Sequence, residues 1–95
     1  MFYYYVVQIA KEGCREKFVE ELNSAKVTDA IRAEDGCIKY DFYFSENNAN
    51  EILLVEIWKS QKHQQVHLTQ PHMDTLRAIK DKYIIDTKLG ENYPR

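Results

Sequence analysis

The segment Ile52–Tyr83, ILLVEIWKSQKHQQVHLTQPHMDTLRAIKDKY, is the part of the chain around which the rest is arranged. It opens as a strand, Ile52–Trp58, that is apolar on both faces apart from Glu56. The polar stretch after this strand carries all three histidines of the protein: His63, His67 and His72. Histidine is the usual proton carrier near neutral pH. Its clustering directly after a buried-looking carboxylate and the only tryptophan therefore predicts chemistry in this segment.

The N-terminal third of the chain has the pattern of a strand followed by a helix. Aromatic and β-branched residues predict a central strand at Phe2–Ala10, with Gln8 as its polar exception. Helix formers then extend over residues 14–34, and a shift in the phase of the apolar positions predicts a bend or break near Asn23-Ser24. Asp35-Gly36 is expected to end this helix, because glycine is the usual left-handed residue at a helix C-terminus.

The remaining elements complete the order of a small mixed fold. Partial alternation at Cys37–Phe44 predicts a second strand, and a polar turn at 46–50 makes a hairpin with the strand that starts near Glu51. Ser60 is a plausible N-cap for a short helix over 61–68, and Pro71 restarts a second helix. The spacing of that second helix predicts a buried stripe: His72, Leu76, Ile79 and Tyr83. Residues 84–89 are predicted to form a last short strand, and 90–95 a tail.

This order predicts an α+β fold of the ferredoxin-like split β-α-β type, an antiparallel sheet with the helices on one face. Two of its strands are apolar on both sides, so the face away from the helices also needs a cover. A second copy of the chain is the economical solution, and we expect a homodimer through the sheet face. The run Tyr3-Tyr4-Tyr5 places alternate rings on opposite faces, so at least one ring should face the interior or the partner.

Length and charge narrow the class of protein. The 95 residues suit one domain, 1–95, with a modest core. The net charge of −2, without a basic stripe, argues against a nucleic-acid partner. No apolar run approaches the roughly 20 residues that span a membrane, and the N-terminus lacks the features of a secretion signal. The two cysteines are far apart and without metal-ligand spacing, so we expect reduced thiols and a cytoplasmic protein.

Two motifs resemble those of a known family. Glu34-Asp35-Gly36-Cys37 followed by Tyr40 is similar to the E-x-G-C-x-x-Y that begins the second strand of antibiotic biosynthesis monooxygenase (ABM) domains. The second motif resembles that family's E-x-W…H…HL…PHM segment: Glu56-Ile57-Trp58, His63, His67-Leu68 and Pro71-His72-Met73. The subgroup with the greatest similarity is that of the small quinol monooxygenase-like proteins. The resemblance implies a dimeric α+β barrel, a cavity between helices and sheet, and oxygenation of a small aromatic quinol or phenol without metal, flavin or haem.

Such a reaction needs a base, a largely apolar cavity, and donors that stabilise developing charge. We expect His67 and His72 to be the first candidates for the base, with Glu56 buried beside the imidazole to orient it. Trp58 and Tyr40 are candidates for the cavity wall and, with His63, for substrate binding. Each has a structural reading too: Glu56 as a paired buried carboxylate, Trp58 as core, His72 as a bridge from helix to sheet, and His63 as an exposed residue.

Three further hypotheses stay open beside the monooxygenase. His63 and His67 have the i, i+4 spacing of metal ligands, but the intervening residues lack the Glu of H-E-x-x-H, so we expect no metal. An isomerase of a small phosphorylated carbonyl compound would need a cation at the cavity, for which Lys59, Lys62 and Arg77 are the candidates. A non-catalytic dimeric binding protein would have its cavity filled by its own side chains. Haem degradation is disfavoured, since relatives with that activity use an Asn in the first strand and MFYYYVVQIA has none.

Overall fold

The computed structural model describes residues 1–90. Its elements, in chain order, are β1 (Phe2–Ala10), α1 (Arg15–Ser24), α2 (Val27–Arg32), β2 (Cys37–Phe44), β3 (Glu51–Trp58), α3 (Gln61–His67), α4 (His72–Tyr83) and β4 (Ile84–Gly90). The predicted α+β, ferredoxin-like order of strands and helices is confirmed. The last strand includes Gly90, and the rest of the predicted tail, 91–95, lies outside the described residues.

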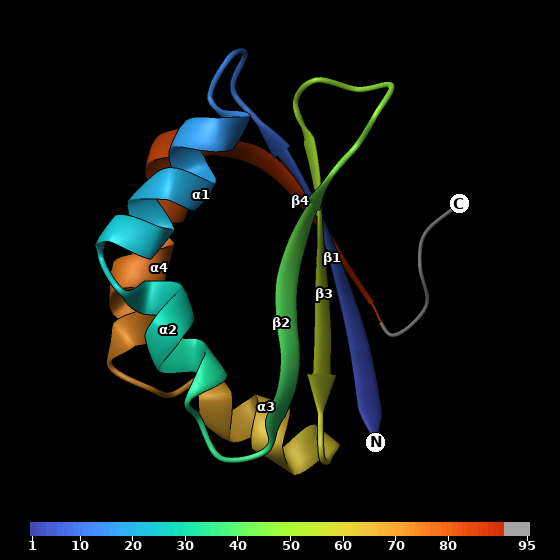
Figure 1. The fold of residues 1–95 in the computed structure, drawn as a ribbon, viewed down its shortest axis with the longest axis vertical. Helices are drawn as coiled ribbons and strands as arrows, with labels where there is room; N and C mark the ends of the chain where they lie inside the picture. Colours follow the sequence, from blue (N-terminus) through green and yellow to red (C-terminus); the bar gives the residue numbers. More distant parts are fainter. Residues whose placement is uncertain (91–95) are drawn as a thin grey trace.

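The four strands form one antiparallel sheet in the order β2-β3-β1-β4, and the helices form a layer over one of its faces (Figure 1). The register places Tyr4 of β1 and Tyr40 of β2 on either side of Glu56 in β3. Gln8 of β1 lies farther along the same strand, opposite Ile52. Side chains two residues apart share a face of a sheet, so these positions all belong to the face under the helices.

The core lies between this inner face and the helices. Strict alternation in β3 buries Ile52, Leu54, Glu56 and Trp58, as their shared parity predicts. The helices contribute Phe18 and Leu22 of α1 and Ile31 of α2 to the same core. Glu56 is therefore a carboxylate within an apolar layer, which requires a partner for its oxygen atoms.

The first helix is broken near Asn23-Ser24, as its change of phase predicts: α1 ends at Ser24, and Ala25 and Lys26 separate it from α2. Lys26 adopts the left-handed conformation with φ of 62°, which turns the chain from α1 into α2. The prediction that Gly36 caps the helix was wrong, because α2 already ends at Arg32. Gly36, with φ of +82°, instead turns the chain into β2, where an added Cβ would lie 2.8 Å or less from three atoms of the His63 side chain.

The second helical pair follows the prediction more closely. Ser60 caps α3, and its hydroxyl oxygen accepts a hydrogen bond from the backbone amide of His63. The inner face of α4 is formed by Met73, Leu76 and Ile79. His72 is only half-buried, because it is the first residue of α4 and lies where the helix starts to cover the sheet.

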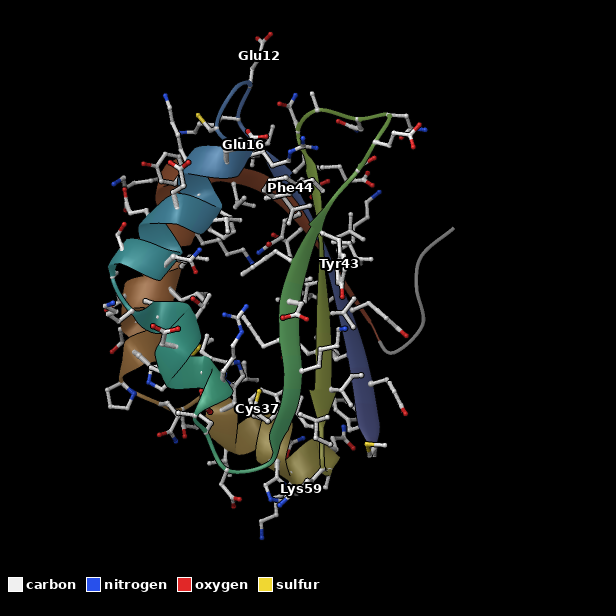
Figure 2. The ribbon with its side chains drawn as sticks, in the orientation of Figure 1. Glu12, Glu16, Cys37, Tyr43, Phe44 and Lys59 are labelled. Carbon is white, nitrogen blue, oxygen red and sulfur yellow. The ribbon has the colours of Figure 1, made fainter. Side chains whose placement is uncertain are left out.

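No helix of residues 1–90 covers the outer face of the sheet (Figure 1). Apart from Lys39, its central part is lined by apolar and tyrosine side chains. Tyr3 and Tyr5 of β1 lie there with Val55 of β3, in an open hollow of about 420 Å³. Tyr43 belongs to the same surface and projects away from the helical layer (Figure 2). Within residues 1–90 no helix has the length and apolar character needed to cross a membrane. Both cysteines are free thiols.

Candidate functional site

Two imidazoles share one carboxylate oxygen. Oε2 of Glu34 accepts hydrogen bonds from Nδ1 of His67 at 2.8 Å and from Nε2 of His72 at 2.7 Å. Glu34 lies in the loop that follows α2, His67 ends α3 and His72 begins α4, so the short turn between α3 and α4 brings both rings to the same acid. A carboxylate has no proton to donate, so both nitrogens must be the donors. In each neutral ring this fixes the tautomer and leaves the opposite nitrogen as a free lone pair.

The His67 ring is the better placed of the two to act as a base. Its side chain is 2 % exposed, lies 4.7 Å from the Trp58 ring, centroid to centroid, and meets the Tyr40 ring edge-on at 5.8 Å. Burial lowers the pKa of His67, while the hydrogen bond and charge of Glu34 partly oppose this shift. A lowered pKa keeps the ring neutral, and therefore able to accept a proton, at neutral pH.

Glu56 does not have the partner that the sequence predicts. Its Oε1 accepts a hydrogen bond from Nε1 of Trp58 at 3.0 Å, and no hydrogen bond joins it to an imidazole in the described part of the chain. The expectation that Glu56 orients the imidazole was therefore wrong, since Glu34 makes that contact. Burial raises the pKa of Glu56 to about 7, with the charge of Glu34 adding to the shift and the Trp58 hydrogen bond opposing it. Glu56 therefore exchanges its proton near neutral pH.

A cavity of about 210 Å³ lies between the inner face of the sheet and helices α3 and α4. Its polar lining at one end combines His67, Glu56 and Tyr40. Burial and the nearby charge of Glu56 raise the pKa of Tyr40 well above its usual value, so its hydroxyl keeps its proton. The middle of the cavity is apolar, with side chains from both layers: Val6, Leu54, Met73 and Leu76. The structure thus brings three of the predicted residues around one partly open cavity.

Three predicted residues lie outside this lining. Trp58 is fully buried beneath the cavity and does not line it, although it contacts the lining residues Glu56 and His67. Trp58 is therefore a core residue, which was the structural alternative. His72 lies behind Glu34. His63 is a third exposed and bonds to Oγ of Ser60 at 2.7 Å, with Asp35 at 3.5 Å. It lines a separate open groove of about 390 Å³ beside α3, not the cavity.

The donor set of the site also has the composition of a metal centre. Within residues 1–90, Glu34, His67 and His72 each offer one ligand atom, and these atoms lie within 4.8 Å of one another. Two imidazoles and one carboxylate are a ligand set used for zinc and for non-haem iron. His63, which the sequence spacing pairs with His67, is not part of the group. In the structure Nδ1 of His67 and Nε2 of His72 are hydrogen-bonded to Oε2 of Glu34.

Sequence reasoning missed the role of Glu34. Glu34 belongs to the E-x-G-C motif, but the motif does not indicate which residues contact this side chain. Its two histidine partners follow it by 33 and 38 positions in the sequence. It also missed Gln8 and Lys80, which both line the cavity. The only sequence signal for Gln8 was its position as the single polar residue of an apolar strand.

The fold and this site place the chain in a known class. The family model for antibiotic biosynthesis monooxygenase (ABM) matches residues 1–78, and the chain belongs to that family. No curated protein matched it. Among solved structures, a Nitrosomonas europaea protein proposed to be an antibiotic biosynthesis monooxygenase is 21 % identical, with a TM-score of 0.82, over 95 % of this chain and 94 % of that one.

Two further structures have the same fold. A Bacteroides thetaiotaomicron protein of unknown function, described as a possible oxidoreductase, is 24 % identical over 93 % of this chain and 90 % of that one, with a TM-score of 0.79. A Mycobacterium tuberculosis protein is 23 % identical over 98 % of this chain and 96 % of that one, with a TM-score of 0.72. At these identities the likeness concerns the fold, and the family supports a monooxygenase at a coarse level.

Proposed function

We propose that this protein is a cofactor-independent monooxygenase that oxidises a small aromatic quinol or polyphenol with O2. The observation that supports this most directly is the position of the His67 ring on the cavity wall, with Nδ1 bonded to Glu34. Nε2 of that ring has no hydrogen-bond partner in residues 1–90, so it is available to take a proton from a bound hydroxyl. The cavity size agrees with a small ring: a cavity of about 150 Å³ binds benzene in another protein, and this one holds about 210 Å³.

The proposed reaction begins with proton transfer from a quinol hydroxyl to Nε2 of His67. The quinolate is electron-rich and passes one electron to triplet O2, which avoids the spin barrier to direct reaction with a closed-shell molecule. Recombination forms a C–O bond and a peroxide, and loss of water leaves a hydroxyquinone. One oxygen atom enters the ring and the other leaves as water, and the quinol supplies all four electrons. No external reductant is required.

The other residues have supporting roles in this proposal. Glu34 fixes the tautomer of His67 and stabilises the imidazolium that forms, as the acid of a catalytic triad does for its histidine. Glu56, with a pKa raised to about 7, can return a proton to the peroxide oxygen. The protonated hydroxyl of Tyr40 is available as a donor to developing negative charge. His72 shares Glu34 and thereby affects His67, so it is a positioning residue.

A homodimer through the outer sheet face, which would complete a dimeric α+β barrel, is part of the proposal. The face is apolar over its central strands and bears Tyr3, Tyr5, Val55 and Tyr43. A chain of this length has little core of its own, so burial of that face would add stability. The two free cysteines fit the reducing cytoplasm, which we propose as the compartment.

Oxygen uptake with a panel of quinols tests the function. We expect uptake by the purified protein and a fall of about 100-fold or more in His67→Gln, because general-base catalysis is worth about 10²–10⁴-fold. His63→Gln is the matched control, since His63 lies in the separate groove and should leave the rate nearly unchanged. No uptake above that of the His67 variant would contradict the proposal.

An isomerase of a small phosphorylated carbonyl compound is the second candidate, because Arg77 and Lys80 line the cavity. Arg77 is already engaged with the Leu68 carbonyl oxygen at 2.8 Å and with Asp74, which weakens it as a phosphate ligand. Proton exchange at the carbon next to the carbonyl of a phosphorylated ketose in D2O, followed by NMR, would favour this candidate. Binding of quinols without turnover in either assay would favour a non-catalytic protein.

A further inference from the structure

Gln8 has a buried polar atom for which the protein supplies no partner. The residue lies on the inner face of β1, is 4 % exposed and lines the cavity. Its Oε1 is fully buried and has no hydrogen bond to any group of residues 1–90. Buried carboxamides are almost always hydrogen-bonded, so an orphaned acceptor on a cavity wall calls for a functional explanation.

Lys80 is a half-buried cation on the same wall. It is half-buried on α4, lines the cavity, and has neither a hydrogen bond nor an ion pair with the described residues. Burial lowers its pKa. Lys80 precedes Tyr83 by about one helical turn, and the Tyr83 carbonyl oxygen bonds to the amide of Lys11, directly after β1. Lys80 thus approaches the end of β1 to which Gln8 belongs.

These two groups lie at the opposite end of the cavity from the base. Glu56 is paired in register with Tyr4, and Gln8 is four residues farther along β1, a distance of about 13 Å along the strand. Val6 and Leu54 form the apolar floor between the two ends. The cavity is therefore polar at both ends and apolar in the middle, which suits an aromatic ring with polar substituents at opposite positions.

We propose that Gln8 is a specificity-determining residue that accepts a hydrogen bond from a second hydroxyl of the substrate, opposite the hydroxyl deprotonated by His67. A hydroxyl can donate to Oε1 of Gln8 and accept from the Lys80 ammonium at the same time, whereas a ring hydrogen or an ether can not do both. The cavity thereby selects 1,4-dihydroxy aromatic compounds over monohydroxy ones. This inference rests on the proposed function and adds the geometry of its substrate.

Anaerobic titration with hydroquinone and with phenol tests the selection apart from turnover. Trp58 is the only tryptophan, and it contacts Glu56 and His67 on the cavity wall, so its fluorescence reports binding. We expect hydroquinone to bind about tenfold more tightly than phenol, the effect of one hydrogen bond that would otherwise leave a buried acceptor unpaired. In Gln8→Leu, hydroquinone affinity should fall to that of phenol while phenol affinity is unchanged.

The outcomes separate this inference from its alternatives. If the wild-type protein binds hydroquinone and phenol with equal affinity, the inference is overturned, and this comparison requires no variant. An equal loss of affinity for hydroquinone and for phenol in Gln8→Leu would also overturn it, because Gln8 would then affect only the packing of the cavity wall. Tighter binding of 4-hydroxybenzoate than of hydroquinone would also overturn it, since the carboxamide nitrogen and Lys80 would then be binding a carboxylate. Selective hydroquinone binding without oxygen uptake would contradict the monooxygenase and leave the role of Gln8 standing.

Discussion

Glu34 and His67 are joined by a 2.8 Å hydrogen bond between Oε2 and Nδ1, although 33 positions separate them in the sequence. The carboxylate is 10 % exposed and the imidazole 2 %, so the pair lies away from bulk water. A hydrogen bond to an ionised carboxylate is strengthened in such surroundings. Burial lowers the pKa of His67, and the hydrogen bond and charge of Glu34 partly oppose that shift.

Loss of the Glu34 charge should weaken catalysis without unfolding the protein. In Glu34→Gln the imidazolium loses its counter-charge, and we expect kcat for oxygen uptake to fall about 100-fold. The neighbouring Asp35→Asn removes an equal charge from a side chain that is 88 % exposed, and its kcat should stay close to wild type. Similar losses in the two variants, at equal circular dichroism, would contradict the role of Glu34.

Glu56 should make stability depend on pH in a defined direction. Its pKa is raised from 4.5 to about 7 on folding, so the folded protein holds this proton more tightly than the unfolded chain. The free energy of unfolding therefore falls as pH rises through this interval, by about 3 kcal/mol for this group. Glu56→Gln keeps an oxygen acceptor for Trp58 and should be more stable than wild type at about pH 8, with no gain at about pH 4. Urea unfolding at both pH values measures this.

The exposed Glu46→Gln is the control for removal of one negative charge, and its stability relative to wild type should show little change between the same pH values. If the stability of Glu56→Gln relative to wild type is higher at the acidic pH than at the basic one, Glu56 is ionised in the folded protein at both pH values.

A charge on the outer face of the sheet should prevent association. Val55 lies in a central strand on that face, and Val55→Lys would bury an unpaired ammonium in the proposed interface. We expect a dimer for the wild-type protein and a monomer for the variant in sedimentation equilibrium. Val66→Lys changes an exposed valine on α3, on the helical side, and should remain dimeric. A monomeric wild-type protein would contradict the dimer.

Two glycines allow backbone strain to be separated from steric overlap. Gly13 and Gly36 both have positive φ, but an added Cβ has open space at Gly13 and overlaps the His63 ring at Gly36. Gly13→Ala should lose about 1–2 kcal/mol of unfolding free energy through strain alone. Gly36→Ala should lose more, because His63 must also move. Chemical denaturation of both variants measures the difference, and equal losses would mean that the His63 side chain rotates away freely.

Chelation should leave activity intact. The proposed reaction uses no metal ion, and its base, His67, is hydrogen-bonded through Nδ1 to Glu34. Oxygen uptake after dialysis against EDTA is expected to equal that of untreated protein. Loss of uptake that one added metal restores would show that Glu34, His67 and His72 act as ligands.

The fold was predictable because its signals are local. The alternation that buries Leu54 and Glu56 has the period of a strand. The start of α3 is marked by Ser60, whose hydroxyl caps the helix by accepting a hydrogen bond from the amide of His63, three residues later. The break in the first helix was predicted from a change of phase, but composition does not determine the left-handed backbone of Lys26.

The site was predicted only in part because its contacts are not local. The inward direction of Glu56 was predicted from its parity in the strand, and Glu56 lines the cavity. His67 also lines the cavity, but it was chosen from the clustering of the histidines and from the family resemblance. The partner of His67 depends on how the loop after α2 packs against the turn between α3 and α4. Such a tertiary contact produces no periodic pattern in the sequence, so it could not be predicted. His72 follows the apolar spacing of α4, yet as the first residue of the helix it meets Glu34 instead of the sheet.

Glu34 and His72 are 38 positions apart, so they leave the ribosome at different times during synthesis. A nascent polypeptide could form the β2–β3 hairpin while α4 is still inside the ribosome, and it would then have the acid without its second imidazole. The proposed oxidation, which uses the complete group of Glu34, His67 and His72, would begin only after almost the whole chain has emerged.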